Sequence, residues 1–273
     1  VSVGYESLAN QNFTSATDSY NTAVGFHAGK EVTTGTDNTI VGGLAFDAAT
    51  TAAGCTMVGK SAGSAITTGG DNTGIGKQAL ENTTSGTSNT AVGKDALEAN
   101  TIASNNTATG FKSLEANTTG SNNTGIGSFA LLNNTTGSNN TAVGNDCMDS
   151  MTTGSNNVAI GVDALQAETA QSNCVAIGYE ALTAQDNSSG GNIYNNALGY
   201  GAGKAITTGG YNTLIGGFAG DVLTGGGSNI CLGYGADCAG AGSDNAITIG
   251  VNITSSSNDF SFGKASNVVK NDF

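Results

Sequence analysis

The sequence predicts an all-β fold, a parallel β-solenoid of about fifteen coils with 17 residues each, and three observations carry this prediction. The motif Asn-Thr-Ala-Val-Gly recurs along the chain, and from Gly25 to Gly178 its closing glycine returns every 17 residues. The residue before each glycine is nearly always Val, Ile or Leu, which is typical of a strand. The 273 residues include no proline, as expected where every backbone N–H must pair with a neighbouring coil.

The repeat length decides which kind of solenoid is expected. Seventeen residues are too few for a helix pair or a propeller blade, but they suffice for two short strands and two turns. Such coils would stack about 4.8 Å apart. The steps from Gly4 to Gly25 and from Gly178 to Gly199 are 21 residues, which indicates a four-residue insertion in each. We predict that the closing glycines are turn glycines: Gly25, Gly42, Gly59, Gly76, Gly93, Gly110, Gly127, Gly144, Gly161 and Gly178.

The strand before each glycine presents two faces because successive side chains alternate. The branched column before the glycine is expected to face the interior as a core ladder, since stacked apolar side chains exclude water. The Thr two residues earlier, for example Thr22 or Thr90, would share that inward face, and Thr109 is the one polar member of the column. The predicted core ladder is Val24, Val41, Val58, Ile75, Val92, Ile126, Val143, Ile160, Ile177, Leu198, Ile215, Leu232 and Ile249.

The residue between those two positions should then point outward, and it is small and apolar. A solvated face would carry charged residues there, so we expect this column to pack against another copy of the chain. The expected inter-chain face is Ala23, Ala91, Ala142, Ala159 and Ala176.

The remainder of each coil is expected to hold a second strand and two turns. Pairs such as Ala79-Leu80 would lie in that strand, and coils with Gly29 or Gly63 in place of the Leu would lose core volume. The Thr-Thr-Gly segments, such as the one ending at Gly35, would be turns whose glycine supplies a positive φ. A recurring Asn is expected to form an amide ladder from coil to coil: Asn21, Asn38, Asn72, Asn89, Asn106, Asn123, Asn140, Asn157, Asn195, Asn212 and Asn229.

Composition and charge exclude several partners. Asp and Glu number 21 against 8 Lys and Arg, so the net charge of −13 disfavours nucleic acid and anionic membranes as partners. No apolar run approaches the ~20 residues of a membrane span. We divide the chain into a repeat domain, residues 1–250, and a non-repeat segment, residues 251–273, leading out of it. Because residue 1 lies in mid-pattern, we expect a longer parent chain.

The residues that could carry chemistry favour no catalytic, cofactor or metal site, and hence no enzyme. His27 is the only histidine and has no nucleophile in a recognisable setting. The acids are scattered over variable positions, and the Gly-Asp-Asn turns at Asp71 and Asp244 lack the regular pattern of calcium-binding repeats. The five cysteines are expected to be small buried residues, with Cys231 and Cys238 as the one pair close enough to bond.

Aromatic residues recur directly after the closing glycine, at Tyr5, Phe26, Phe111, Tyr179, Tyr200 and Tyr234. They could stack on the sugars of a cell-surface polysaccharide. The interpretation we favour is that they pack between chains or stand singly on the surface, because other coils carry Lys at this position.

The Asn-Thr-Ala-Val-Gly-x-x-Ala-Leu repeats resemble those of phage tail-fibre proteins over essentially the whole chain. They are also similar to the head repeats of trimeric autotransporter adhesins, whose units are somewhat shorter. Both families build homotrimers of left-handed β-rolls, so the resemblance implies a homotrimer and the left hand.

The stretch from Phe260 to Phe273 resembles the segment that leads into a C-terminal chaperone domain in many tail fibres. The expected function is therefore a structural and adhesive segment of a virion tail appendage. Its partners would be itself, other fibre or tail proteins, and a glycan or protein receptor.

The first alternative is an adhesin head on a bacterial surface. A more distant alternative is an ice-binding solenoid, which needs flat outward rows of Thr. We expect the Thr column to point inward, which argues against ice binding.

Overall fold

The structure is a computed structural model that describes residues 1–13, 18–186 and 191–272. In these ranges the chain is all-β, without helices, and winds as a parallel β-solenoid of about fifteen turns with roughly 17 residues per coil. Nothing in these ranges forms a helix long and apolar enough to cross a membrane. The chain divides into two compact units, residues 1–138 and 139–273.

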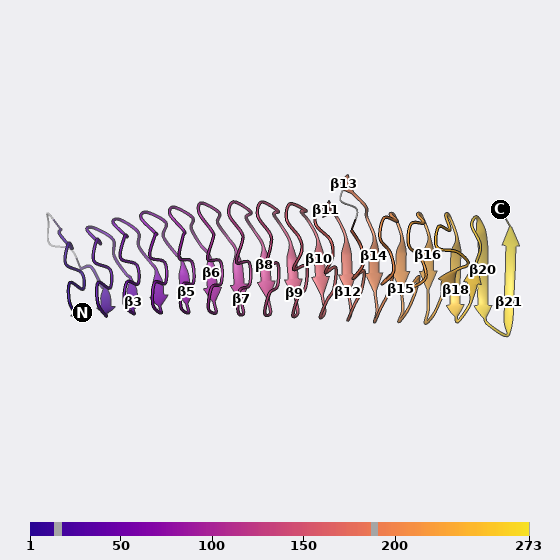
Figure 1. Cartoon of the computed structure of the whole chain (residues 1–273), viewed down its shortest axis with the longest axis horizontal. Coiled ribbons are helices and arrows are strands. Elements are labelled where there is room, and N and C mark those ends of the chain that lie inside the picture. The colour runs from indigo at the N-terminus through magenta and orange to yellow at the C-terminus, as the bar shows by residue number, and fades with distance from the viewer. Residues whose placement is uncertain (14–17, 187–190, 273) are drawn as a thin grey trace. The chain divides into compact units, whose positions relative to one another are not determined.

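The first unit stacks one three-residue strand per coil after a shorter first strand (Figure 1). Successive strands pair in parallel with a register offset of one repeat, as in Thr39 against Thr56 and Thr90 against Thr107. The strands are β1 (Ser2–Val3), β2 (Thr22–Val24), β3 (Thr39–Val41), β4 (Thr56–Val58), β5 (Thr73–Ile75), β6 (Thr90–Val92), β7 (Thr107–Thr109) and β8 (Thr124–Ile126).

The second unit repeats this stack and then changes it. Its main strands are β9 (Thr141–Val143), β10 (Val158–Ile160), β12 (Val175–Ile177), β14 (Asn196–Leu198), β15 (Thr213–Ile215), β16 (Ile230–Leu232), β18 (Ile247–Val251), β20 (Asp259–Lys264) and β21 (Asn267–Asp272). Two small side sheets pair β11 (Gln171–Ser172) with β13 (Gly191–Asn192), and β17 (Asp237–Cys238) with β19 (Thr254–Ser255).

Stacking continues past the predicted domain boundary at residue 250. Strand β20 pairs in parallel with β18, which places Gly263 opposite Gly250 and Phe262 opposite Ile249. Only β21 departs from the solenoid, because it pairs with β20 in antiparallel fashion.

The closing glycines lie in stacked columns, as the repeat predicted. Those from Gly25 to Gly178 have φ between 135° and 144°, a conformation that residues with a side chain rarely adopt. A Cβ placed on Gly25 would lie 2.6 Å from the carbonyl oxygen of Gly42 in the next coil. Glycine is therefore required both for its φ and for the close approach of neighbouring coils.

The prediction of which strand face is buried was wrong. The alanine column is the interior: Ala23, Ala91, Ala142, Ala159 and Ala176 are all fully buried within the chain itself. The Val/Ile ladder instead faces outward, with Val24 37% and Ile126 41% exposed. The Thr column, which shares its face, is likewise at least partly exposed.

The physical reason is the narrow interior of a 17-residue coil. The opposite wall already contributes large buried side chains such as Leu80 and Leu97, so the strand has room only for a small residue. Where the strand residue is large, the opposite position is glycine. A Cβ on Gly29 would lie 2.7 Å from Cδ1 of Ile40, and one on Gly63 would lie 2.7 Å from Sδ of Met57. The Ile40 and Met57 side chains thus occupy the space beside Gly29 and Gly63, so these coils do not lose core volume as we expected.

In most coils the segment after the closing glycine is a series of turns rather than the predicted second strand; β17 and β19, which follow Gly233 and Gly250, are the exceptions. Its Leu residues adopt left-handed backbone conformations, with φ of 58° at Leu80 and 52° at Leu97. The chain therefore reverses direction tightly enough to aim each Leu into the coil.

The Thr-Thr-Gly turns also differ from expectation. Gly35, Gly69 and Gly209 do not have a positive φ; a Cβ at these positions would collide with a carbonyl oxygen of the following coil. Asn122 and Asn139 supply the left-handed residue instead, with φ of 60°, and asparagine tolerates that conformation well.

The Asn ladder is confirmed. In a typical coil, the Asn38 N–H donates to Oδ1 of Asn21 at 2.9 Å, and Nδ2 of Asn21 donates to the Gly35 carbonyl at 2.8 Å. Every member of the column is buried. Each amide thus satisfies backbone groups in the turns, which would otherwise be unpaired inside the solenoid.

Candidate functional site, an outward apolar ladder

The most distinctive surface feature is the branched side-chain column on the outer face of the main strands. We call it the outward ladder; it consists of the residues that the sequence analysis assigned to the core. In the first unit Val41 is 38% and Ile75 40% exposed, and in the second Leu198 is 47% and Ile215 40% exposed. Phe262 of β20 extends the column and is 54% exposed. Such a regular row of half-exposed branched residues makes this face the candidate interaction surface of the chain.

A column of Thr runs beside the outward ladder. Thr22, Thr73 and Thr107 are half-buried, and Thr39 is exposed. In the second unit this position is apolar in several coils, as at Val158, where the outer strand face loses its hydroxyl. The outer face is therefore mixed Thr and Val/Ile in the first unit and more apolar in much of the second.

Aromatic rings form stacks next to this face. The Tyr5 and Phe26 ring centroids lie 5.6 Å apart, and Tyr179 stacks on Tyr200 at 5.2 Å. All four rings are more than 40% exposed. The sequence analysis missed that Phe218, one residue further along its coil, joins the Tyr200 stack edge-on at 5.1 Å. That contact follows from the repeat, because the two positions lie in adjacent coils.

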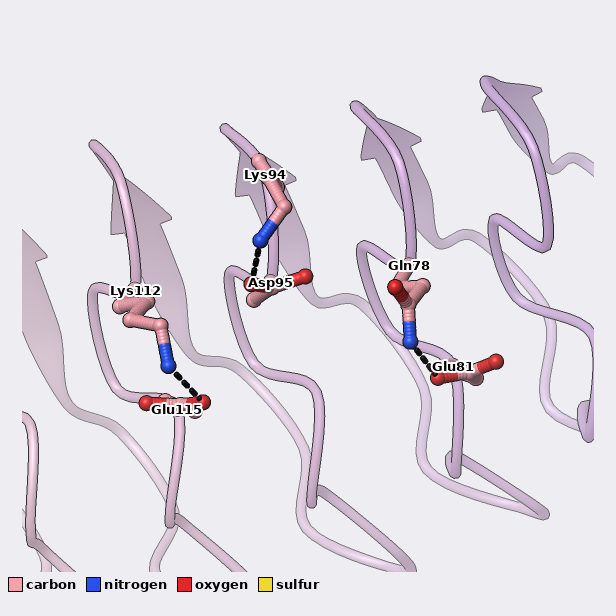
Figure 2. A network of polar contacts seen from close by, with 6 residues as sticks. All are labelled: Gln78, Glu81, Lys94, Asp95, Lys112 and Glu115. Atoms are coloured by element: carbon pink, nitrogen blue, oxygen red, sulfur yellow. Dashed lines mark hydrogen bonds and ion pairs between the residues drawn. The ribbon is translucent and has the colours of Figure 1, made fainter.

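A network of charged side chains lies on the turns after the closing glycines in the first unit (Figure 2). Lys112 Nζ contacts Glu115 Oε1 at 2.7 Å, and Lys94 pairs with Asp95. One oxygen each of Asp95, Glu98 and Glu115 lie within 4.8 Å of one another. Burial, followed by the charge of Asp95, raises the pKa of Glu98. Because two of the three carboxylates already have a Lys partner, ion pairs account for this cluster.

The same network includes an amide in place of a lysine. Gln78 Nε2 donates to Glu81 Oε2 at 2.7 Å (Figure 2). The Glu at this position recurs in three consecutive coils, at Glu81, Glu98 and Glu115; Gln78 contacts Glu81, and Lys112 contacts Glu115. The network therefore reflects stacking of like positions.

The other singled-out residues have structural partners. His27 lies 3.1 Å from Glu6 Oε2, and the same carboxylate oxygen contacts Lys30 Nζ at 2.7 Å. Asp244 accepts a hydrogen bond from the Gly227 N–H at 2.7 Å, which joins two coils.

All five cysteines are buried, as predicted. Burial raises the pKa of Cys55 to about 11 and that of Cys147 to about 12. The structure brings only one pair together: the Sγ atoms of Cys231 and Cys238 are 3.4 Å apart.

The described part of the chain has no pocket. No protein-family model and no curated protein sequence matches the chain. The outward ladder is therefore the candidate functional feature of the surface.

Proposed function

We propose that the chain is a structural segment of a homotrimeric fibre, a phage tail appendage that contributes to host attachment. The observation that carries this proposal is the outward ladder. Val and Ile recur at one position of nearly every coil, and many of them stay roughly 40% exposed in a single chain although neighbouring coils cover the rest of each side chain. A second and third copy of the chain, carrying the same ladder in the same register, would bury it.

The energy available supports self-association. Covering a branched side chain that is about 40% exposed gains on the order of 1 kcal/mol, and the outward ladder repeats this along each unit. The Ala column offers no such gain, because it is already buried in the chain's own interior. The proposed inter-chain face is therefore the opposite of the one expected from sequence.

The left hand of the coils and the threefold symmetry are part of the proposal and follow from the family resemblance. In such a trimer the aromatic stacks at Tyr179 and Tyr200 would border the interface. An adhesin head on a bacterial surface would use the same ladder in the same way. A glycan or protein receptor and the other fibre or tail proteins complete the proposed set of partners.

Ice binding is a second candidate because of one observation. The Thr column faces outward, whereas the expectation that argued against ice binding was that it would point inward. Thr22, Thr73 and Thr90 share a regular strand face with the outward ladder. A flat row of this kind would be free in a monomer and covered in a trimer.

The oligomeric mass of the purified chain tests the proposal. Light scattering is expected to give about three times the chain mass of 26.7 kDa. The double variant Val92→Asp and Ile126→Asp should give single folded chains with an unchanged β-type circular dichroism spectrum, since both positions face outward. Ser85→Asp, on an exposed turn, is the matched control and should remain trimeric.

Two results would contradict the proposal. A monomeric wild-type chain would remove the fibre model, and thermal hysteresis from that monomer would support ice binding instead. A trimer that survives the double substitution would show that the outward ladder is not the interface.

A further inference from the structure

The Cys231 and Cys238 side chains meet inside the second unit. Cys231 is the middle residue of β16 and occupies the inward position that Ala holds in many other coils. Cys238 ends β17, seven residues later, and lies across the interior of the same coil. Both are fully buried, and their Sγ atoms lie 3.4 Å apart.

We propose that Cys231 and Cys238 form a redox-active dithiol that closes to an intrachain disulfide when the chain meets a small-molecule disulfide oxidant. A disulfide has an S–S distance of about 2.05 Å, so the sulfurs must approach by about 1.4 Å. The other three cysteines, Cys55, Cys147 and Cys174, are free and buried. The proposal does not depend on the fibre function.

The chemistry balances with an oxidant such as oxidised glutathione. One cysteine loses its proton, and its thiolate attacks the glutathione disulfide, releasing one glutathione thiolate and leaving a mixed disulfide. The second cysteine thiolate attacks the protein sulfur of that mixed disulfide and releases the second glutathione. The two electrons reduce glutathione disulfide to two thiols, which take up the two protons lost by the cysteines.

The surroundings provide a route for the oxidant. The hydrogen bond with the adjoining Cys238, followed by burial, raises the pKa of Cys231, so the closed interior disfavours the thiolate. Strand β17, however, pairs only with the two-residue β19, and it runs into an exposed bend at residues 239–242. Such a short, edge-placed strand opens at low cost. Exchange is therefore expected in a locally opened state, and the closed coil then shields the product.

The test uses the folded full chain, reduced and then incubated with oxidised glutathione. Remaining thiols are alkylated under denaturing conditions and located by mass spectrometry of digested peptides. The reduced chain should carry five alkyl groups and the oxidised chain three, at Cys55, Cys147 and Cys174. The cross-linked chain should be lighter by about 2 Da before alkylation, the mass of the two hydrogens removed.

Matched variants separate the pair from other thiol chemistry. Cys231→Ala introduces the residue that other coils carry at this position, and Cys238→Ala removes the partner. Either variant should retain all four remaining thiols or carry a glutathione adduct, with no intrachain link. Oxidation should raise the Tm of the wild-type chain by several degrees. It should leave unchanged the Tm of a variant that carries both Cys231→Ala and Cys238→Ala.

The incubation is repeated while the chain refolds from urea, because oxidised glutathione can then reach both cysteines even if the folded interior excludes it. Five free thiols after both incubations, or a link that joins any other pair, would overturn the proposal. A wild-type Tm that does not change on oxidation would show that the bond does not fit the native coil, and would overturn it equally.

Discussion

The side-chain oxygen of Asn89 accepts a hydrogen bond from the backbone N–H of Asn106 at 3.0 Å, one coil further along the solenoid. Both residues are fully buried. Asn106 repeats the relationship with the N–H of Asn123 at 2.9 Å, and its Nδ2 donates to the Gly120 carbonyl at 2.9 Å. This amide column joins the turns of successive coils where the strands do not reach.

Replacing Asn106 with Ala should therefore destabilise the first unit. The Asn123 N–H would lose its partner inside the solenoid, whereas the Gly120 carbonyl would keep the hydrogen bond that Nδ2 of Asn117 donates to it at 3.0 Å. The expected loss in the free energy of unfolding is about 1 to 3 kcal/mol, the cost of one unpaired buried backbone group. Urea unfolding measures this loss. Asn82→Ala, at an exposed position, is the control and should change stability by less than about 0.5 kcal/mol. Equal stabilities of the two variants would show that the column is not structural.

The adjacent glycines Gly42 and Gly43 should respond very differently to alanine. Gly42 has a φ of 141°, and a Cβ there would lie 2.6 Å from the Gly59 carbonyl carbon. A Cβ on Gly43 would lie 4.0 Å from the nearest atom, the carbonyl oxygen of Phe26. Gly42→Ala should lower the free energy of unfolding by roughly 2 kcal/mol or more, whereas Gly43→Ala should be nearly neutral. Thermal unfolding of both variants decides the matter, and a tolerated Gly42→Ala would contradict the stacked column.

The repeat made the coil length, the parallel stack and the Asn ladder predictable. Identical residues at identical intervals must occupy like positions in successive coils. Asn is one of the few residues whose side chain can both accept a hydrogen bond from a backbone N–H and donate one to a backbone carbonyl in a buried turn. The repeat cannot show which face of the strand points into the interior, because the side chains on both faces recur with the same period. We assigned the larger side chains of Val24 and Val41 to the core on hydrophobicity, but the narrow coil admits the smaller Ala23.

The sequence did contain a signal for the correct face. The large strand residues Ile40, Met57 and Leu214 coincide with glycine at the position that is Leu in other coils. Such compensation between two columns indicates that they touch across one interior. The left-handed Leu conformations had no comparable signal, because leucine rarely adopts them.

The second unit should lose stability as the pH rises through the acid range. Burial raises the pKa of Asp237 to about 7, against the effect of the Cys238 N–H, which donates to its Oδ1 at 2.9 Å. The charge of Asp221 raises it further. The folded chain thus retains a proton that the unfolded chain, with a pKa near 3.9, has already lost. The free energy of unfolding should fall between about pH 4 and about pH 7 and level off above that.

The Asp237→Asn variant isolates this contribution, because the amide does not titrate. Urea unfolding at about pH 5 and about pH 8 should show a smaller decrease in the variant than in the wild-type chain. If both proteins lose the same stability between these two pH values, Asp237 is ionised in the folded state and the pH argument fails.

In the proposed trimer the outward ladder lies outside the interior of its own chain, and the other two copies of the chain cover it. Reactivity of a cysteine at position 75 tests this claim most directly. Ile75 is 40% exposed in the single chain, and the five native cysteines are buried, so they contribute little background. In the assembled protein, Ile75→Cys should react with a thiol reagent at least about tenfold more slowly than Ser85→Cys on the exposed turn. Equal rates for the two variants would contradict the claim.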